Sequence, residues 1–228
     1  MRCGRILELA DWPTTRRSRQ VALLAIVAVV AVACVPYTRV DQPGVKQWEP
    51  PAARVVFGGD SITVATTTDL RQELAAQTDW WSNVKAASGW TMSNFMAADD
   101  GVLNDVGFEP DAAVINIGTN DVTLCGQDPQ CDPAQMATQL DAVWAPYQQS
   151  GVGCRIAVTI AHVDGSPINA RIAHLLGTGA VTDVADWHAH SVSHPEWFTD
   201  TKGHLTTVGI EAFSQFLVQQ LEQACPTA

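Results

Sequence analysis

The sequence predicts an α/β protein, a three-layer α/β/α sandwich built on a five-stranded parallel sheet. Short apolar segments with strand character alternate along the chain with segments of helical spacing, which is typical of parallel sheets with helices on both faces. Polar signals directly follow several of the apolar segments. Because the carboxyl ends of parallel strands share one edge of a sheet, we expect these polar residues to lie close together.

The individual elements follow from local spacing. Strands are expected at residues 54–58, 83–87, 112–117, 155–161 and 181–187. Helices are expected at residues 66–77, 92–106, 168–176 and 208–225. A further helix begins after Asp132, a favourable N-cap that precedes Pro133 at the first helical position. Right-handed crossovers then place every strand-to-helix loop on one side of the sheet.

Residues 1–33 have the pattern of a signal peptide or membrane anchor. The first 20 residues include five arginines, and the uncharged apolar run 21–33 follows them. That run is shorter than the roughly 20 residues that span a bilayer, so cleavage or lipidation is favoured over a permanent helix. The small residues 31–33 fit a cleavage site, and Cys34 after them resembles a bacterial lipidation site. Plain secretion and an uncleaved anchor are the alternatives.

The rest of the chain divides into a tether and a domain. Residues 34–53 contain four prolines and little periodicity, which is typical of a semi-extended tether. Residues 54–228 suit one domain with one core. We expect this domain to be extracytoplasmic, to be held at a membrane only through the N-terminal lipid or anchor, and to be a monomer.

The charge of this part of the chain excludes nucleic acid as a partner. The chain has 13 Lys and Arg and 24 Asp and Glu; without residues 1–33, 8 basic and 22 acidic residues remain, a net charge of −14. Such a surface repels nucleic acid and anionic lipid headgroups. We interpret the acidity as a means of keeping an exported protein soluble.

Four cysteines follow the tether, and an even number outside the cytoplasm indicates two disulfides. Of the three possible pairings we favour Cys125 with Cys131, which closes a polar loop, and Cys154 with Cys225, which ties a strand to the last helix. A metal site is the alternative, but no Cys-x-x-Cys or paired-histidine spacing supports it.

Ser61 stands where a nucleophile would be useful. It follows the apolar run 55–57 through Gly59 and Asp60, and a helix is expected to begin soon after it. Amides at a helix N-terminus can stabilise an oxyanion, and a glycine permits the tight turn. The alternative is an ordinary helix cap, because serine and aspartate are both favoured caps. The Gly-x-Ser-x-Gly elbow of α/β-hydrolases is not present here.

Four segments together resemble the SGNH (GDSL-type) hydrolases, a family of serine esterases and lipases. Residues 57–63 (Phe-Gly-Gly-Asp-Ser-Ile-Thr) resemble the opening block of that family. Residues 87–91, 117–121 and 204–209 resemble its later blocks, in the same order. The resemblance spans residues 54–224 and implies the flavodoxin-like fold of that family, with no metal and no cofactor.

The resemblance also implies roles for particular residues. Ser61 would attack the acyl carbon and His204 would take its proton. The backbone amides of Ser61 and Gly89 and the side chain of Asn120 would hold the oxyanion. The residue types suit these roles independently, because Asn120 offers an amide donor at a strand end and Gly89 permits a close approach of the backbone to substrate.

The acid of the triad departs from the family pattern. The family places an aspartate three residues before the histidine, where this chain has Thr201, and the nearest acid is Asp200, four residues before. We expect Asp200 to reach the imidazole across a loop one residue longer, with Gly203 absorbing the geometry. Alternatively His204 is oriented by a backbone carbonyl, and Asp186 and Glu196 are more distant substitutes.

Two further groups of residues are expected to be structural. The histidines at 188, 190 and 194 are tempting as ligands, but no acidic pattern completes a metal site, and we interpret them as hydrogen-bonded surface residues. Tryptophans are numerous, and only Trp90, next to Gly89, is expected near the site.

These features predict an exported serine esterase that forms an acyl-enzyme and takes a small-molecule, lipid or glycan ester as substrate. Two alternatives remain: an acyltransferase acting on a cell-envelope glycan, because an alcohol can discharge the same intermediate, and a binding module that keeps the fold without catalysis.

Overall fold

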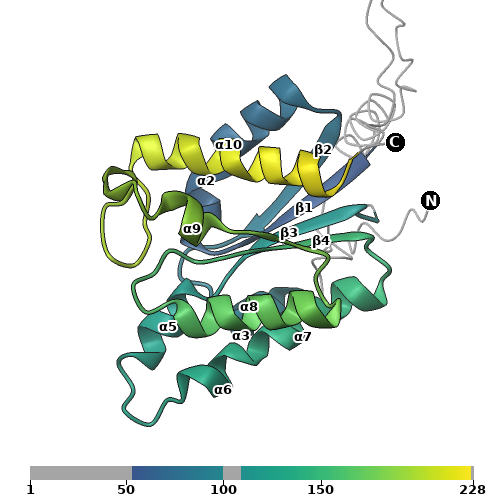
Figure 1. The fold of residues 1–228 in the computed structure, drawn as a ribbon. Helices are drawn as coiled ribbons and strands as arrows, with labels where there is room; N and C mark the ends of the chain where they lie inside the picture. The colour runs from purple at the N-terminus through teal and green to yellow at the C-terminus, as the bar shows by residue number, and fades with distance from the viewer. Residues whose placement is uncertain (1–52, 100–108, 227–228) are drawn as a thin grey trace, which may run out of the picture. The chain divides into compact units, whose positions relative to one another are not determined.

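Five parallel strands form one sheet in the order β2-β1-β3-β4-β5. The computed structural model describes residues 53–99 and 109–226 (Figure 1). The strands are β1 (Ala53–Gly59), β2 (Trp80–Ala86), β3 (Ala112–Asn116), β4 (Cys154–Val158) and β5 (Asp183–Ala185). The predicted parallel sheet is confirmed.

Helices cover both faces of the sheet (Figure 1). One face carries α2 (Ser61–Gln77), α9 (Trp187–Ser191) and α10 (Thr207–Ala224). The other carries α3 (Met92–Asp99), α5 (Thr119–Cys125), α6 (Pro133–Ala137), α7 (Gln139–Gln149) and α8 (Ser166–Thr178). A short 3₁₀ helix, η1 (Pro195–Trp197), precedes α10. This is the predicted three-layer sandwich.

The protein has two hydrophobic cores, one on each face of the sheet, because successive side chains of the central strands point to opposite faces. In β1, Val55 and Phe57 pack with α2 and α10, while Val56 packs with the opposite helices. Successive side chains of a strand point to opposite faces, so a fully buried strand must be apolar on both. All five residues of β3 are buried, and the first four of them are apolar.

The first helix begins earlier than its spacing indicates. The sequence predicts a helix from residue 66, but α2 begins at Ser61. β-branched residues weaken helix propensity, and four of residues 62–66 are β-branched, so the helical spacing alone did not extend back to the start expected soon after Ser61. The Asp60 side chain caps this turn by accepting a hydrogen bond from the Ile62 amide.

Other boundaries also differ. β2 begins at Trp80 rather than at residue 83, because an aromatic pair there suits a strand. The fifth strand is limited to Asp183–Ala185, and Trp187 begins α9. Two helices, α6 and α7, follow Asp132, and α5 was not predicted because its first residues also suit a turn. Of the helix expected at 92–106, residues 100–106 lie outside the described part.

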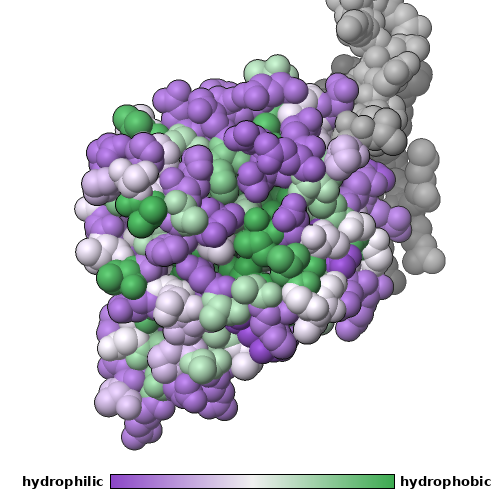
Figure 2. All heavy atoms as spheres, viewed as in Figure 1, coloured by the Kyte–Doolittle hydropathy of each residue, from purple (hydrophilic) through white to green (hydrophobic). Residues whose placement is uncertain are grey.

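The surface is mostly hydrophilic on the face shown in Figure 2, and hydrophobic residues gather between α10 and α8, where the sheet edge lies in Figure 1. None of the helices in the described ranges is long and apolar enough to cross a membrane. The predicted signal or anchor, Cys34 and the tether up to residue 52 lie outside the described residues.

Two disulfides are formed among the described residues. Cys125 is joined to Cys131 in the loop after α5, and Cys154 at the start of β4 is joined to Cys225 after α10. These are the pairings that the sequence favoured. The second bridge fastens the last helix to the central sheet.

We expect the two bridges to differ in their effect on stability. Chain-entropy arguments give about 4 kcal/mol for Cys154–Cys225, whose cysteines are 71 residues apart, and about 2 kcal/mol for Cys125–Cys131, which are 6 apart. Urea unfolding of the two paired Cys→Ser variants checks this. A larger loss from the shorter bridge would contradict it.

Candidate active site

Ser61 is presented at the carboxyl edge of the sheet by a tight turn. β1 ends at Gly59, Asp60 caps α2, and Ser61 is the first residue of that helix. A Cβ atom on Gly59 would lie 2.5 Å from the Asn116 carbonyl oxygen, so only glycine fits against β3 here. The turn is therefore held close to the end of the neighbouring strand.

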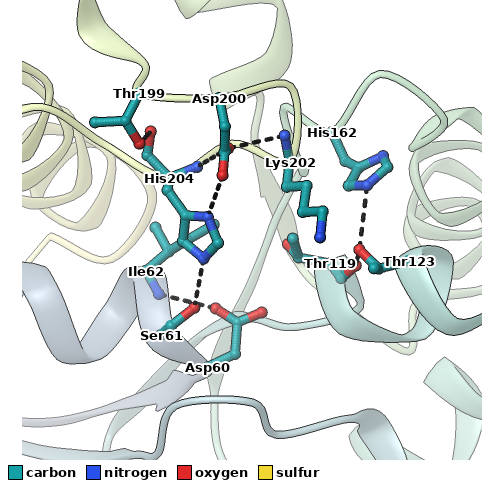
Figure 3. A network of polar contacts seen from close by, with 10 residues as sticks. All are labelled: Asp60, Ser61, Ile62, Thr119, Thr123, His162, Thr199, Asp200, Lys202 and His204. Atoms are coloured by element: carbon teal, nitrogen blue, oxygen red, sulfur yellow. Dashed lines mark hydrogen bonds and ion pairs between the residues drawn. The ribbon is translucent and has the colours of Figure 1, made fainter.

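A chain of side-chain hydrogen bonds connects Ser61, His204 and Asp200 (Figure 3). The Ser61 hydroxyl lies 3.2 Å from His204 Nε2, and His204 Nδ1 lies 2.7 Å from Asp200 Oδ2. With Nδ1 donating to the carboxylate, Nε2 keeps its lone pair and can accept the serine proton. This is the arrangement of a nucleophile, a base and an orienting acid.

The loop that carries Asp200 accommodates its extra residue. Asp200 Oδ1 accepts hydrogen bonds from the backbone amides of Lys202, at 2.9 Å, and His204, at 3.2 Å. Gly203 has φ +92°, a left-handed conformation that glycine adopts without strain. The Thr201 carbonyl accepts from the Val163 amide at 3.1 Å, which anchors this loop to the segment after β4. Asp200 therefore reaches His204 across four residues.

The environment of Asp200 favours its charged form. Partial burial acts to raise the pKa, but hydrogen bonds from the His204 side chain and from the backbone amides of His204 and Lys202 outweigh it and lower the pKa. Asp200 is thus an anion at neutral pH and can stabilise a protonated imidazole. The two substitutes lie elsewhere: Asp186 caps α9 and accepts from Thr159, and Glu196 pairs with His194.

The two candidate oxyanion turns are tied to each other. Asn120, in the first turn of α5, donates from Nδ2 to the Trp90 carbonyl at 2.9 Å. Gly89, which precedes Trp90, has φ +79° and is exposed. The second hydrogen of the Asn120 amide remains available for a substrate oxygen. The turn containing Gly89 is thereby placed beside Asn120.

Asp121 strengthens the same connection. Both of its carboxylate oxygens accept from the Met92 amide, at 3.0 and 3.2 Å, at the start of α3. Burial raises its pKa, and the Met92 amide acts in the opposite direction. These bonds make Asp121 an acceptor that fixes the loop. Trp90 stacks edge-on against Phe95, with ring centroids 6.1 Å apart.

Four polar residues around the triad were not singled out from the sequence: Asp60, Thr119, His162 and Lys202 (Figure 3). His162 is 6% exposed; its Nε2 lies 3.3 Å from the Thr123 hydroxyl, and its Nδ1 accepts from the Asp164 amide. Desolvation lowers the pKa of His162. The position of such residues in loops indicated that they could lie near the site, but their residue types are common in any loop.

Asp60 is a buried carboxyl directly before the candidate nucleophile. Its side chain is fully buried, and desolvation raises its pKa to about 6, partly offset by the Ile62 amide and by His204. A carboxyl in this environment opposes folding when it is charged.

Two of the histidines after β5, His190 and His194, belong to an aromatic cluster. The His194 ring stacks on Trp197 at 3.9 Å, and the His190 ring stacks on Phe216 at 4.7 Å. Trp187 lies at the centre of this cluster and is stacked on Trp197. Within the described ranges, no group of three or more His, Cys, Asp or Glu is arranged to hold a metal ion.

Two cavities open beside the site. One, of about 530 Å³, lies against the second half of α5 and the start of α6, and Val122, Met136 and Asp164 are among its lining residues. The other, of about 440 Å³, is lined by Val192, Phe198 and Asp200 among others. Neither is lined by Ser61 or His204. Val163 borders both and is 71% exposed.

Comparison with known proteins gives one family. The model of the GDSL-like lipase/acylhydrolase family matches residues 57–212. No curated protein sequence matches the chain significantly.

Solved structures share the fold at low sequence identity. A lipase/acylhydrolase from Enterococcus faecalis is similar with TM-score 0.61 and 18% identity, over 77% of this chain and 98% of that one. An acetyl xylan esterase is similar with TM-score 0.61 and 21% identity, over 74% and 99%. The catalytic domain of peptidoglycan O-acetyltransferase A from Streptococcus pneumoniae is similar with TM-score 0.56 and 17% identity, over 75% and 94%.

Because the pKa of Asp60 is raised, we expect the stability difference between the parent and Asp60→Asn to depend on pH. Asp60 ionises near 3.8 when unfolded and near 6 when folded, so its contribution to stability falls as pH rises from about 4 to about 6 and stays low above. Asparagine also caps helices but does not ionise. At pH 8, Asp60→Asn should therefore have a higher melting temperature than the parent. Its free energy of unfolding should be greater by up to about 3 kcal/mol.

Thermal unfolding at pH 4 and pH 8 checks this, because the two proteins should differ little at pH 4. An equal difference at both pH values, or a loss of stability at pH 8, would contradict the assignment of a buried charge.

Proposed function

Because the chain belongs to the GDSL-like lipase/acylhydrolase family, we propose that it is an exported serine esterase that cleaves a carboxylic ester through an acyl-enzyme on Ser61. The observation that carries this proposal is the hydrogen-bonded chain from Ser61 through His204 to Asp200. The nucleophile lies at the N-terminus of α2, and the base is oriented by an anion.

The first half-reaction forms the acyl-enzyme. His204 Nε2 takes the Ser61 proton as Oγ attacks the acyl carbon, and Asp200 stabilises the imidazolium that results. Donors for the oxyanion are the Ser61 and Gly89 amides and Asn120 Nδ2. Each such donor contributes roughly 3 kcal/mol to transition-state stabilisation. The imidazolium then protonates the departing alcohol.

The second half-reaction returns the enzyme to its starting state. His204 takes a proton from water, whose oxygen attacks the acyl carbon. The bond from the acyl carbon to Ser61 Oγ then breaks, the imidazolium returns its proton to Oγ, and the acid is released. An alcohol acceptor in place of water would give acyl transfer from the same intermediate. The His204 side chain is 44% exposed, so the site is accessible to water, which favours hydrolysis.

Export is supported by two features of the chain. Both disulfides are formed in the structure, and disulfides persist in oxidising compartments. The basic and apolar pattern of residues 1–33 is that of an export signal, and Cys34 is the proposed lipidation site.

Replacement of the nucleophile tests the proposed chemistry. Ser61→Ala should lower kcat/KM for a short-chain aryl ester by about four orders of magnitude or to background, because no hydroxyl remains to form the acyl-enzyme. Ser150→Ala makes the same chemical change at an exposed position after α7 and should leave turnover unchanged.

Steady-state kinetics with matched thermal unfolding checks both variants. Turnover by Ser61→Ala at the parent rate would overturn the proposal. Product analysis with an added glycan alcohol separates the alternatives: a dominant transferred ester would identify an acyltransferase instead of a hydrolase.

A further inference from the structure

Two buried oxygen atoms beneath Ser61 have no hydrogen-bond partner among the described residues. Asp60 uses Oδ1 to accept from the Ile62 amide, but its Oδ2 is unpaired. The Thr119 hydroxyl is also unpaired. The two residues are 0% and 3% exposed. Unpaired buried polar atoms are rare in native proteins, so two at one place need an explanation.

The Thr119 hydroxyl lowers the pKa of the Asp60 carboxyl, as a nearby hydrogen-bond donor does, although no hydrogen bond between the two residues is formed in the structure. Figure 3 shows both residues close to the triad, Asp60 below His204 and Thr119 to the right of it. A hydrogen bond from the Thr119 hydroxyl to Asp60 Oδ2 would satisfy both atoms.

Asp60 and Thr119 each lie next to a residue of the proposed catalytic site. Asp60 directly precedes the nucleophile Ser61, and Thr119 directly precedes the oxyanion donor Asn120. The turns follow β1 and β3, which are paired with Gly59 opposite Asn116. The pairing of β1 with β3 ends there. Beyond it, a contact between Asp60 and Thr119 would join the two turns.

We infer that Asp60 and Thr119 are positioning residues, whose carboxyl–hydroxyl contact holds Ser61 at the correct distance from Asn120. This inference rests on the proposed function, in which Ser61 attacks the carbonyl whose oxygen Asn120 binds. Displacement of a reacting group by about 1 Å can lower a rate by up to about 100-fold.

The charges that face Asp60 explain why a carboxyl is retained there. The ionisable groups that act on it are His204, which favours the carboxylate, and Asp121 of α5, which disfavours it. A carboxylate at position 60 also favours the positive charge that His204 acquires during acyl transfer. Burial of the carboxyl opposes folding at neutral pH, as expected for a group kept for function.

The test separates positioning from folding. Thr119→Val keeps the shape of the side chain but removes the hydroxyl, and it should lower kcat by about 10-fold with KM little changed. Thr119→Ser restores the hydroxyl and should recover kcat to within about twofold. Asp60→Asn should lower kcat while raising the melting temperature at pH 8. Ser214→Ala, which removes another buried unpaired hydroxyl in α10, is the matched control and should leave kcat unchanged.

Kinetics and thermal unfolding of the same preparations decide the outcome. Parent-like kcat in Thr119→Val, an equal loss in Ser214→Ala, or a loss confined to KM would overturn the inference. If Ser61→Ala also retains turnover, the proposed function itself fails. If Ser61→Ala is inactive while Thr119→Val is parent-like, only the positioning role fails.

Discussion

The pairing of β1 with β3 is the constraint on which the site depends. These strands lie at the centre of the sheet, and the chain turns outward from them in opposite directions, which makes their carboxyl ends a topological switch point. The turn after β1 presents Ser61, and the turn after β3 presents Asn120. The pairing of Gly59 with Asn116, where no side chain fits on Gly59, brings those turns together.

The proposed base, His204, comes from a different part of the chain and is held by different contacts. His204 lies in the loop before α10, whose Cys225 end is held to β4 by a disulfide. Three backbone contacts and the left-handed Gly203 shape the loop so that Asp200 reaches the imidazole. The family's usual spacing is therefore one solution among several, since what the chemistry needs is a carboxylate at Nδ1 and not a fixed separation in sequence.

Local patterns predicted the fold and the main candidates, but tertiary contacts determined the rest. Ser61 and Asn120 were recognisable because each lies in a short motif after an apolar segment, and His204 because it lies in the last motif before the C-terminal helix. The reach of Asp200 was not decidable from spacing, because it depends on the loop conformation around Gly203. The contact between Asp60 and Thr119 joins residues that are far apart in the sequence, and their types also suit ordinary caps and turns. The first turn of α2 is rich in β-branched residues, which interrupt the helical pattern in the sequence, and the Asp60 cap stabilises the helix there.

The central claim is that Ser61 is the activated nucleophile of a hydrogen-bonded triad. Incubation of the domain with an aryl phosphonate, followed by mass spectrometry of the intact protein and its peptides, tests this most directly. We predict a single adduct on Ser61 that forms in the parent and is strongly slowed in Asp200→Asn, because the imidazole then lacks its orienting anion. Absence of an adduct, or an adduct on another residue, would contradict the account and favour a binding module that keeps the fold without its chemistry.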